Sequence, residues 1–253
     1  MNTILITGNG AVNNGWQPVL HALKKIYRLE DINPKFANFI FASIIYKLRW
    51  LDTQLGCSQH DIQLKKNLEK KFDETVSDYK KIKNEIINEL KKAHESGLIS
   101  PRKELKFLKY LYLNEETKII TTNWDSTIIN SIGNRNDTIF LHGCTSDTLF
   151  LPSETIEESY RQRAKLEIPY GKVTGMAISW LQGYGKRIVI YGLSLSPLDV
   201  ELGLIIADSF SDTSNPKSII IVDPDYESVK QRLCFLLPHV KPECYHPEDL
   251  SEI

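Results

Sequence analysis

Five short apolar runs, each ending at a glycine or a polar cluster, constrain the fold of this 253-residue chain more than any other feature. Uninterrupted runs rich in β-branched residues are typical of strands buried on both faces of a parallel sheet. Helical segments are expected between several runs, near Thr174–Leu181, Leu198–Ser209 and Tyr226–Leu236. Strands that alternate with helices predict an α/β fold with a Rossmann-like parallel sheet. The five runs are Thr3–Thr7, Lys118–Thr122, Thr138–Leu141, Arg187–Tyr191 and Ser218–Val222.

The segment that follows the first strand and its helix (about Gln17–Arg28) has a helical pattern throughout. Apolar residues recur three or four positions apart over Phe36–Leu51 and over Leu64–Ala93, and charges of both signs lie between those of the second stretch. This spacing is typical of amphipathic helices with one solvated face. Pro101, directly after Ser100, predicts the first turn of another helix that ends near residue 113.

The chain therefore divides into two parts. Residues 1–34 and 114–253 are expected to form the Rossmann-like domain, and residues 35–113 an all-helical insertion that acts as a lid or a subdomain. The apolar residues of Phe36–Leu51 are more numerous than one narrow stripe needs, which favours a homo-oligomer formed through this block.

Charge and cysteine content exclude several classes of protein. Lysine and arginine number 31 against 32 acidic residues, so the near-neutral chain gives no electrostatic case for nucleic-acid binding or a polybasic membrane anchor. The two uncharged runs, Phe36–Tyr46 and Ile188–Leu198, are too short to span a bilayer. No secretory leader is evident, and the four cysteines form no CxxC pair, so we expect a cytoplasmic protein without a metal site.

The clusters that end the strands predict where a ligand binds. In an open parallel sheet, ligands bind outside the carboxyl ends of the strands, so all of these clusters are expected at one edge. The first of them, Gly8-Asn9-Gly10, either brings backbone N–H groups to a pyrophosphate or forms a plain strand–helix turn. Position 13 is Asn, so the third glycine of a dehydrogenase fingerprint is missing, which disfavours a dehydrogenase.

Four polar residues at later strand ends are candidates for chemistry. Asn123 and Asp125, two positions apart, suit the binding of a carboxamide or a water, although either side chain could instead cap the next helix. His142 is placed to act as a general base, or it is a structural histidine. Asp223 suits ribose hydroxyls, or it is a turn residue before Pro224.

These clusters, in this order, resemble the motifs of the sirtuin-like superfamily, specifically its bacterial NAD-glycohydrolase branch. Four stretches carry the resemblance: Gly8-Asn9-Gly10-Ala11, Thr121-Thr122-Asn123-Trp124-Asp125, Leu141-His142-Gly143, and Tyr191-Gly192-Leu193-Ser194-Leu195-Ser196 followed by Asp199. By position, the resemblance implies that Asn123 and His142 are catalytic and that Asp125 holds the nicotinamide end. It also implies that the dinucleotide contacts Gly8, Asn9, Gly10, Gly192, Ser194 and Asp223.

The resemblance implies cleavage of NAD⁺ to nicotinamide and ADP-ribose, in a role in defence against phage. Unchecked cleavage of NAD⁺ would harm the host cell, so we expect a gate or an activating partner, and the helical insertion is the candidate for the gate. The four-cysteine zinc module of the deacetylases is absent, because only Cys144 lies in the corresponding stretch, and the deacetylase activity is excluded with it. Two alternatives stay open. One is a non-catalytic sensor or assembly module that binds NAD⁺ or ADP-ribose, and the other is an interaction protein in which the long helices are the functional part.

Overall fold

The computed structural model describes residues 2–58, 61–114, 116–132, 137–145, 149–151, 171–196, 199–210 and 217–252.

A six-stranded, entirely parallel sheet forms the centre of the fold, with the strand order β5-β4-β1-β6-β7-β8. Numbered within the sheet alone, this order is 3-2-1-4-5-6, the order of the Rossmann fold. The predicted Rossmann-like α/β fold is thus confirmed, and the five predicted strands end within one residue of their expected positions. The strands are β1 (Thr3–Thr7), β4 (Lys118–Thr121), β5 (Thr138–Phe140), β6 (Arg187–Tyr191), β7 (Ser218–Val222) and β8 (Glu243–Tyr245).

The sheet is buried on both faces, which explains why its strands are continuously apolar. In β1, Leu5 packs into the core on one face, whereas Ile4 and Ile6 pack into the core on the other. Sequence reasoning missed β8, because its three residues Glu-Cys-Tyr lack an apolar run and only β7 pairs with it. A strand that lies at the edge of a sheet needs less apolar surface than a central one.

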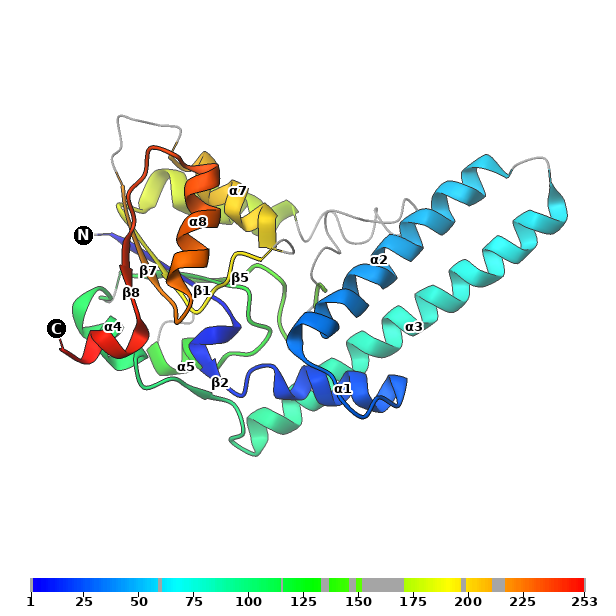
Figure 1. Cartoon of the computed structure of the whole chain (residues 1–253), viewed down its shortest axis with the longest axis horizontal. Helices are drawn as coiled ribbons and strands as arrows, with labels where there is room; N and C mark the ends of the chain where they lie inside the picture. Colours follow the sequence, from blue (N-terminus) through cyan, green and yellow to red (C-terminus); the bar gives the residue numbers. More distant parts are fainter. Residues whose placement is uncertain are drawn as a thin grey trace.

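Helices cover the two faces unequally (Figure 1). One face is covered by α7 (Val200–Asp208), α8 (Tyr226–Leu236) and a helical segment of residues 171–179 that continues into the π-helical turn η2 (Trp180–Tyr184). The C-terminal 3₁₀ segment η4 (Pro247–Glu252) packs on the opposite face. That face also carries α1 (Gln17–Tyr27), α2 (Pro34–Cys57), α3 (Ile62–Glu95), α4 (Leu105–Leu111) and α5 (Thr127–Ile132).

Helices α2 and α3 form a long hairpin that extends away from the sheet (Figure 1). Each helix begins at a side-chain cap: Asn33 Oδ1 accepts a hydrogen bond from Phe36 N (2.9 Å), and Asp61 Oδ1 accepts one from Leu64 N (2.9 Å). Such caps satisfy backbone donors that the first helical turn leaves without a partner. The hairpin shares one hydrophobic core with the sheet, because apolar residues of α1, α2 and α3 join the cluster that contains Leu5.

The expectation of helices alone in residues 35–113 is wrong at one place. Ser100–Pro101 form a short strand, β3, which pairs antiparallel with β2 (Val12–Asn13). Asn13 Nδ2 donates to Ser100 Oγ (3.2 Å) and to Pro101 O (3.4 Å), which stabilises the extended conformation. Proline is tolerated here because an edge strand of two residues does not need its N–H group. Helix α4 consequently begins at Leu105 rather than at Pro101.

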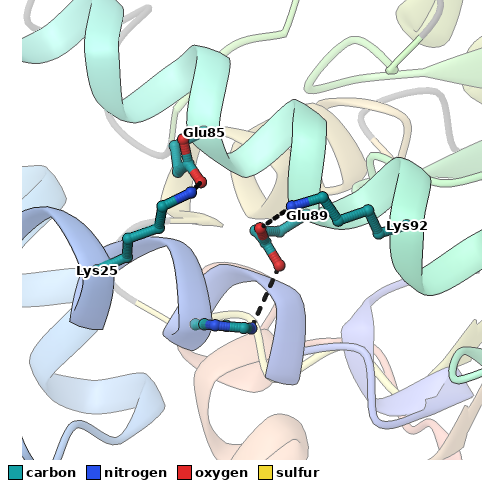
Figure 2. A network of polar contacts seen from close by, with 5 residues as sticks. Lys25, Glu85, Glu89 and Lys92 are labelled. Carbon is teal, nitrogen blue, oxygen red and sulfur yellow. Dashed lines mark hydrogen bonds and ion pairs between the residues drawn. The ribbon is translucent and has the colours of Figure 1, made fainter.

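A buried carboxylate ties α1 to α3. The Glu89 side chain is only 8% exposed; it contacts Lys92 Nζ (2.7 Å) on its own helix and His21 Nδ1 (3.2 Å) on α1. Its hydrogen bond from Lys92, helped by nearby positive charge, lowers its pKa, although burial opposes this. Figure 2 shows the second link, in which Lys25 of α1 reaches Glu85 of α3. The contacts of Glu89 with His21 and of Glu85 with Lys25 thus join α3 of the hairpin to α1.

Among the residues that the structure describes, none of the helices combines the length and the apolar character needed to cross a membrane.

Candidate functional site

A cleft with a cavity of about 220 Å³ lies at the carboxyl edge of the sheet. It opens beside the ends of β1 and β6, where the strand order reverses, and this is the place where open α/β sheets bind ligands. Of the nine residues predicted for the site, seven line the cleft, and Gly8 and Asp125 do not. The described lining residues are Asn9, Gly10, Gly15, Trp16, Asn38, Thr122, Asn123, Trp124, His142, Gly192, Ser194, Ser196, Asp199 and Asp223.

Three glycines allow the loops after β1 and β6 to pack backbone against backbone. Gly8 N donates to Tyr191 O (3.2 Å) and Gly10 N donates to Gly192 O (2.8 Å). Gly192 has a φ of +59°, and a Cβ there would lie 2.2 Å from Ala11 N. Glycine is therefore required by the close approach of the loops. Because Gly8 and Gly10 donate their N–H groups within the protein, a pyrophosphate at this turn would need other donors.

Asn9 lies between the glycines, and its side chain folds back over the following turn. A Cβ on Gly15 would approach Asn9 Oδ1 to 1.9 Å, so glycine at position 15 makes room for the amide. Asn9 and Gly15 both line the cleft, beside Trp16 at the start of α1. The residue that stands between the two glycines therefore shapes one wall of the cleft.

Asn123 is the most informative residue of the cleft. Its side chain is buried, with the residue only 5% exposed, yet neither Oδ1 nor Nδ2 has a hydrogen-bond partner among the residues that the structure describes. Its backbone is held firmly, because Asn123 N donates to Thr121 Oγ1 (3.1 Å), which also accepts from Thr7 Oγ1 (2.9 Å). A buried amide without partners is costly, and a ligand or water that supplies both partners removes this cost.

Asp125 lies outside the cleft lining and caps the next helix. Its Oδ1 accepts a hydrogen bond from Thr127 N (2.8 Å), the first residue of α5. This arrangement is the capping role that an Asx residue before a helix favours. The cap engages the Asp125 carboxylate at the start of α5, so this side chain does not line the cleft. Asn123, two residues earlier, does line it.

His142 and Trp124 form the wall beside Asn123. His142 is partly buried, and its backbone carbonyl accepts a hydrogen bond from Phe150 N (2.9 Å). Trp124 Nε1 donates to Phe150 O (3.1 Å), and its ring meets Phe41 of α2 edge-on at a centroid distance of 6.4 Å. Phe150, in the segment after β5, and the insertion helix α2 thus both contact the Trp124 side chain.

Asp223 and Ser194 lie at the other end of the cleft. Burial raises the pKa of the Asp223 carboxyl, and the hydrogen bond that Asp223 Oδ1 accepts from Asp225 N (2.8 Å) offsets part of that effect. Ser194 is exposed, and its carbonyl accepts a hydrogen bond from Arg232 of α8. Both residues line the cleft, and a carboxylate at the end of a parallel strand is suited to ribose hydroxyls.

Sequence reasoning did not assign four polar residues to the cleft, and one of them, Thr122, directly follows β4. Ser196 Oγ donates to Asp199 Oδ2 (2.9 Å) at the start of α7, and both residues line the cleft. Asn38 reaches the cleft from α2. The signal for Asn38 is that it interrupts an otherwise apolar stretch of the insertion, but only the packing of α2 against the sheet domain decides which way it faces.

Clusters of three or more His, Cys, Asp or Glu side chains that could hold a metal ion are absent from the described part of the chain. Comparisons with protein-family models, with curated proteins and with solved structures found no match to this chain.

Proposed function

We propose that the protein is an NAD⁺ glycohydrolase that cleaves the bond between nicotinamide and ribose. The observation that supports this most is the buried, unpartnered amide of Asn123 in a cleft at the switch point of a Rossmann-like sheet. An amide that lacks both a donor and an acceptor partner is complementary to another carboxamide, such as that of nicotinamide, because the two groups form a reciprocal pair of hydrogen bonds.

The proposed reaction uses two side chains. Asn123 orients the nicotinamide carboxamide, or the attacking water, at the reacting end of the cleft. As the bond from ribose C1′ to the nicotinamide nitrogen breaks, nicotinamide leaves with the electron pair and positive charge develops on the ribose. Water then forms the new bond to C1′, and His142 accepts its proton as general base. Asp125 has no part in this step, because its carboxylate caps α5.

The opposite end of the cleft would bind the adenosine half. We propose that the Asp223 carboxylate accepts hydrogen bonds from ribose hydroxyls and that Ser194 lies along the pyrophosphate. A drug-sized ligand usually occupies about 300–1,000 Å³. A cavity of about 220 Å³ is smaller than this range, so we expect the cleft to widen when a whole dinucleotide binds.

A second function, the sensing of NAD⁺ or ADP-ribose without cleavage, is favoured by two observations. The carboxylate of Asp125, which was expected at the reacting end, is used as a helix cap. The N–H groups of Gly8 and Gly10 are also engaged within the protein. A cleft with fewer charged groups near the reacting bond stabilises an oxocarbenium-like transition state less well.

Two measurements on the full chain separate these functions. A fluorescent NAD⁺ analogue reports cleavage, and thermal denaturation with NAD⁺ or ADP-ribose reports binding, because a ligand that binds only the folded state raises its stability. Cleavage with a thermal shift supports the glycohydrolase. A shift without cleavage supports the sensor, and the absence of both contradicts both proposals.

A blocking variant shows whether binding uses this cleft. Ser194→Trp fills the cleft from an exposed position, so we expect it to abolish the thermal shift with NAD⁺ while the protein still folds. Gly10 is unsuitable for this purpose, since a Cβ there would meet the Gly192 backbone at 2.9 Å and disturb the loop packing itself. An unchanged shift in Ser194→Trp would place the ligand elsewhere.

A further inference from the structure

Helix α2 has an aromatic stripe on its solvent side. We use this name for Phe36, Phe39, Tyr46 and Trp50, whose exposed fractions are 41%, 64%, 56% and 55%. The first two rings lie parallel, with centroids 6.0 Å apart and planes inclined by 8°. The opposite side of α2 packs into the core through residues such as Phe41, Ile44 and Leu48. The stripe is thus a second apolar face that nothing in the described part of the chain covers.

The spacing of the stripe fits the side of another helix. Its members and Ser43 follow one another at intervals of three, four, three and four residues. This 3.5-residue repeat is the seam along which two helices pack side by side. The exposed Ser43 is the small residue in the middle of the seam, and a small residue there lets two helices approach closely.

We propose that the aromatic stripe is an interface with a second copy of this chain, in which the two α2 helices run antiparallel and cross at Ser43. Phe36 and Trp50 each lie seven residues from Ser43, so an antiparallel pair places Phe36 of one protomer opposite Trp50 of its partner. Such an interface is isologous, which is the arrangement of most homodimers.

A pairing of a cation with an aromatic ring supports the same register. Lys47, four residues after Ser43, falls opposite Phe39, where an ammonium group and an aromatic ring attract each other. In a parallel pair, by contrast, Lys47 would lie level with the partner's Lys47 and not with Phe39.

The area of the stripe is that of a modest interface. Fully buried aromatic side chains contribute about 150–250 Å² each, so four rings that are about half exposed offer roughly 400 Å² per protomer. Both protomers together bury roughly 800 Å² through the rings, to which the stems of Lys35, Lys47 and Arg49 add. Standard dimers bury about 1,600 Å². We therefore expect a dimer whose population rises with protein concentration.

Light scattering and sedimentation of the full chain test this inference, and they need no ligand, so the result is independent of the proposed function. At high concentration we expect twice the chain mass of 29.0 kDa. Phe39→Asp should return the protein to the monomer mass while it stays folded, and at a dilution where the wild type is also monomeric the two should melt alike, because Phe39 is mostly exposed. Phe235→Asp is the matched control, since Phe235 is 87% exposed on α8, and it should leave the dimer intact.

Cross-linking tests the register. In a Cys57→Ser background, which removes the exposed cysteine, Ser43→Cys should form a disulfide-linked dimer, because residue 43 faces its own copy at the crossing point. Phe39→Cys should not, since the two copies of residue 39 lie about 12 Å apart along an antiparallel pair. Cross-linking at both positions indicates a parallel pair and overturns the proposed arrangement. A monomer mass at every concentration overturns the interface itself.

Discussion

Two buried polar side chains, Glu89 at the junction of α1 with α3 and Asn123 at the end of β4, are almost equally hidden from solvent but differ in their partners. Glu89 is 7% exposed and has both Lys92 and His21 within contact distance. Asn123 is 5% exposed, and neither of its side-chain polar atoms has a hydrogen-bond partner in the described part of the chain. Burial alone therefore does not distinguish a structural polar residue from a functional one.

The difference in partners predicts opposite roles. A buried group that is fully partnered lowers the free energy of the folded state, and its removal leaves other charges without their counterparts. A buried group without partners costs stability, and it persists where a ligand supplies the missing hydrogen bonds. The following variants test whether the junction serves stability and the cleft serves function.

The largest effect is expected on NAD⁺ cleavage by His142→Ala and Asn123→Ala. Each should reduce the rate by about 10²–10⁴-fold, because the first removes the general base and the second removes the orienting amide. The double variant should be little slower than the slower single variant, because residues that act as a unit are not additive. Cleavage of the fluorescent analogue measures the rates.

Matched controls for that prediction come from α3. His94→Ala and Asn88→Ala remove the same kinds of side chain from exposed positions, so they should cleave at the wild-type rate. Melting temperatures of all variants must accompany the rates. Wild-type rates in folded His142→Ala and Asn123→Ala would contradict the catalytic role of these residues.

The next effect is a loss of stability in Glu89→Leu. Removal of the carboxylate deletes its contacts with Lys92 and His21, so we expect the variant to unfold at a lower urea concentration than wild type. Because the pKa of Glu89 is lowered in the folded state, this stabilisation is complete at neutral pH and is lost as the pH falls through that pKa. Urea denaturation at neutral and acidic pH should show the difference between variant and wild type shrinking in acid.

Replacement of Asn123 in the cleft by leucine should change the free energy of unfolding in the opposite direction. Asn123→Leu replaces a buried amide that lacks partners with an apolar side chain of similar size, so we expect the unliganded protein to gain about 1 kcal/mol. The same variant should lose its thermal shift with NAD⁺. A loss of stability in Asn123→Leu as large as that in Glu89→Leu would mean that both residues are structural.

The smallest effect is expected from Asp223→Asn. The pKa of Asp223 is raised in the folded state, so its ionised form costs stability, and the cost appears as the pH rises through its ordinary carboxyl range. Asparagine keeps the oxygen that accepts from Asp225 N, so the variant should melt slightly higher than wild type at neutral pH and equally in strong acid. Its affinity for NAD⁺, measured by calorimetry, should fall.

Several features of the fold and the cleft were predictable from sequence because they depend on local chemistry. Strands buried on both faces must be apolar without interruption, so β1, β6 and β7 were recognisable with their exact bounds. The polar residues that follow such strands must meet at one edge, and this placed Asn123 and His142 in one cleft. The long amphipathic helix α3 was visible for the same reason, since its spacing repeats over many turns.

Tertiary structure alone decided which of two chemically similar residues faces the cleft. Asn123 and Asp125 are both polar and both follow β4, but the start of α5 engages only the carboxylate of Asp125 as a cap. Asn38 likewise lines the cleft only because of the way α2 packs. Gly8 and Gly10 are needed because the loop after β6, which is distant in sequence, lies against their backbone. Local pattern sets which residues are buried or polar, whereas the partner that each buried polar group finds, or lacks, is set by segments brought together only in the folded chain.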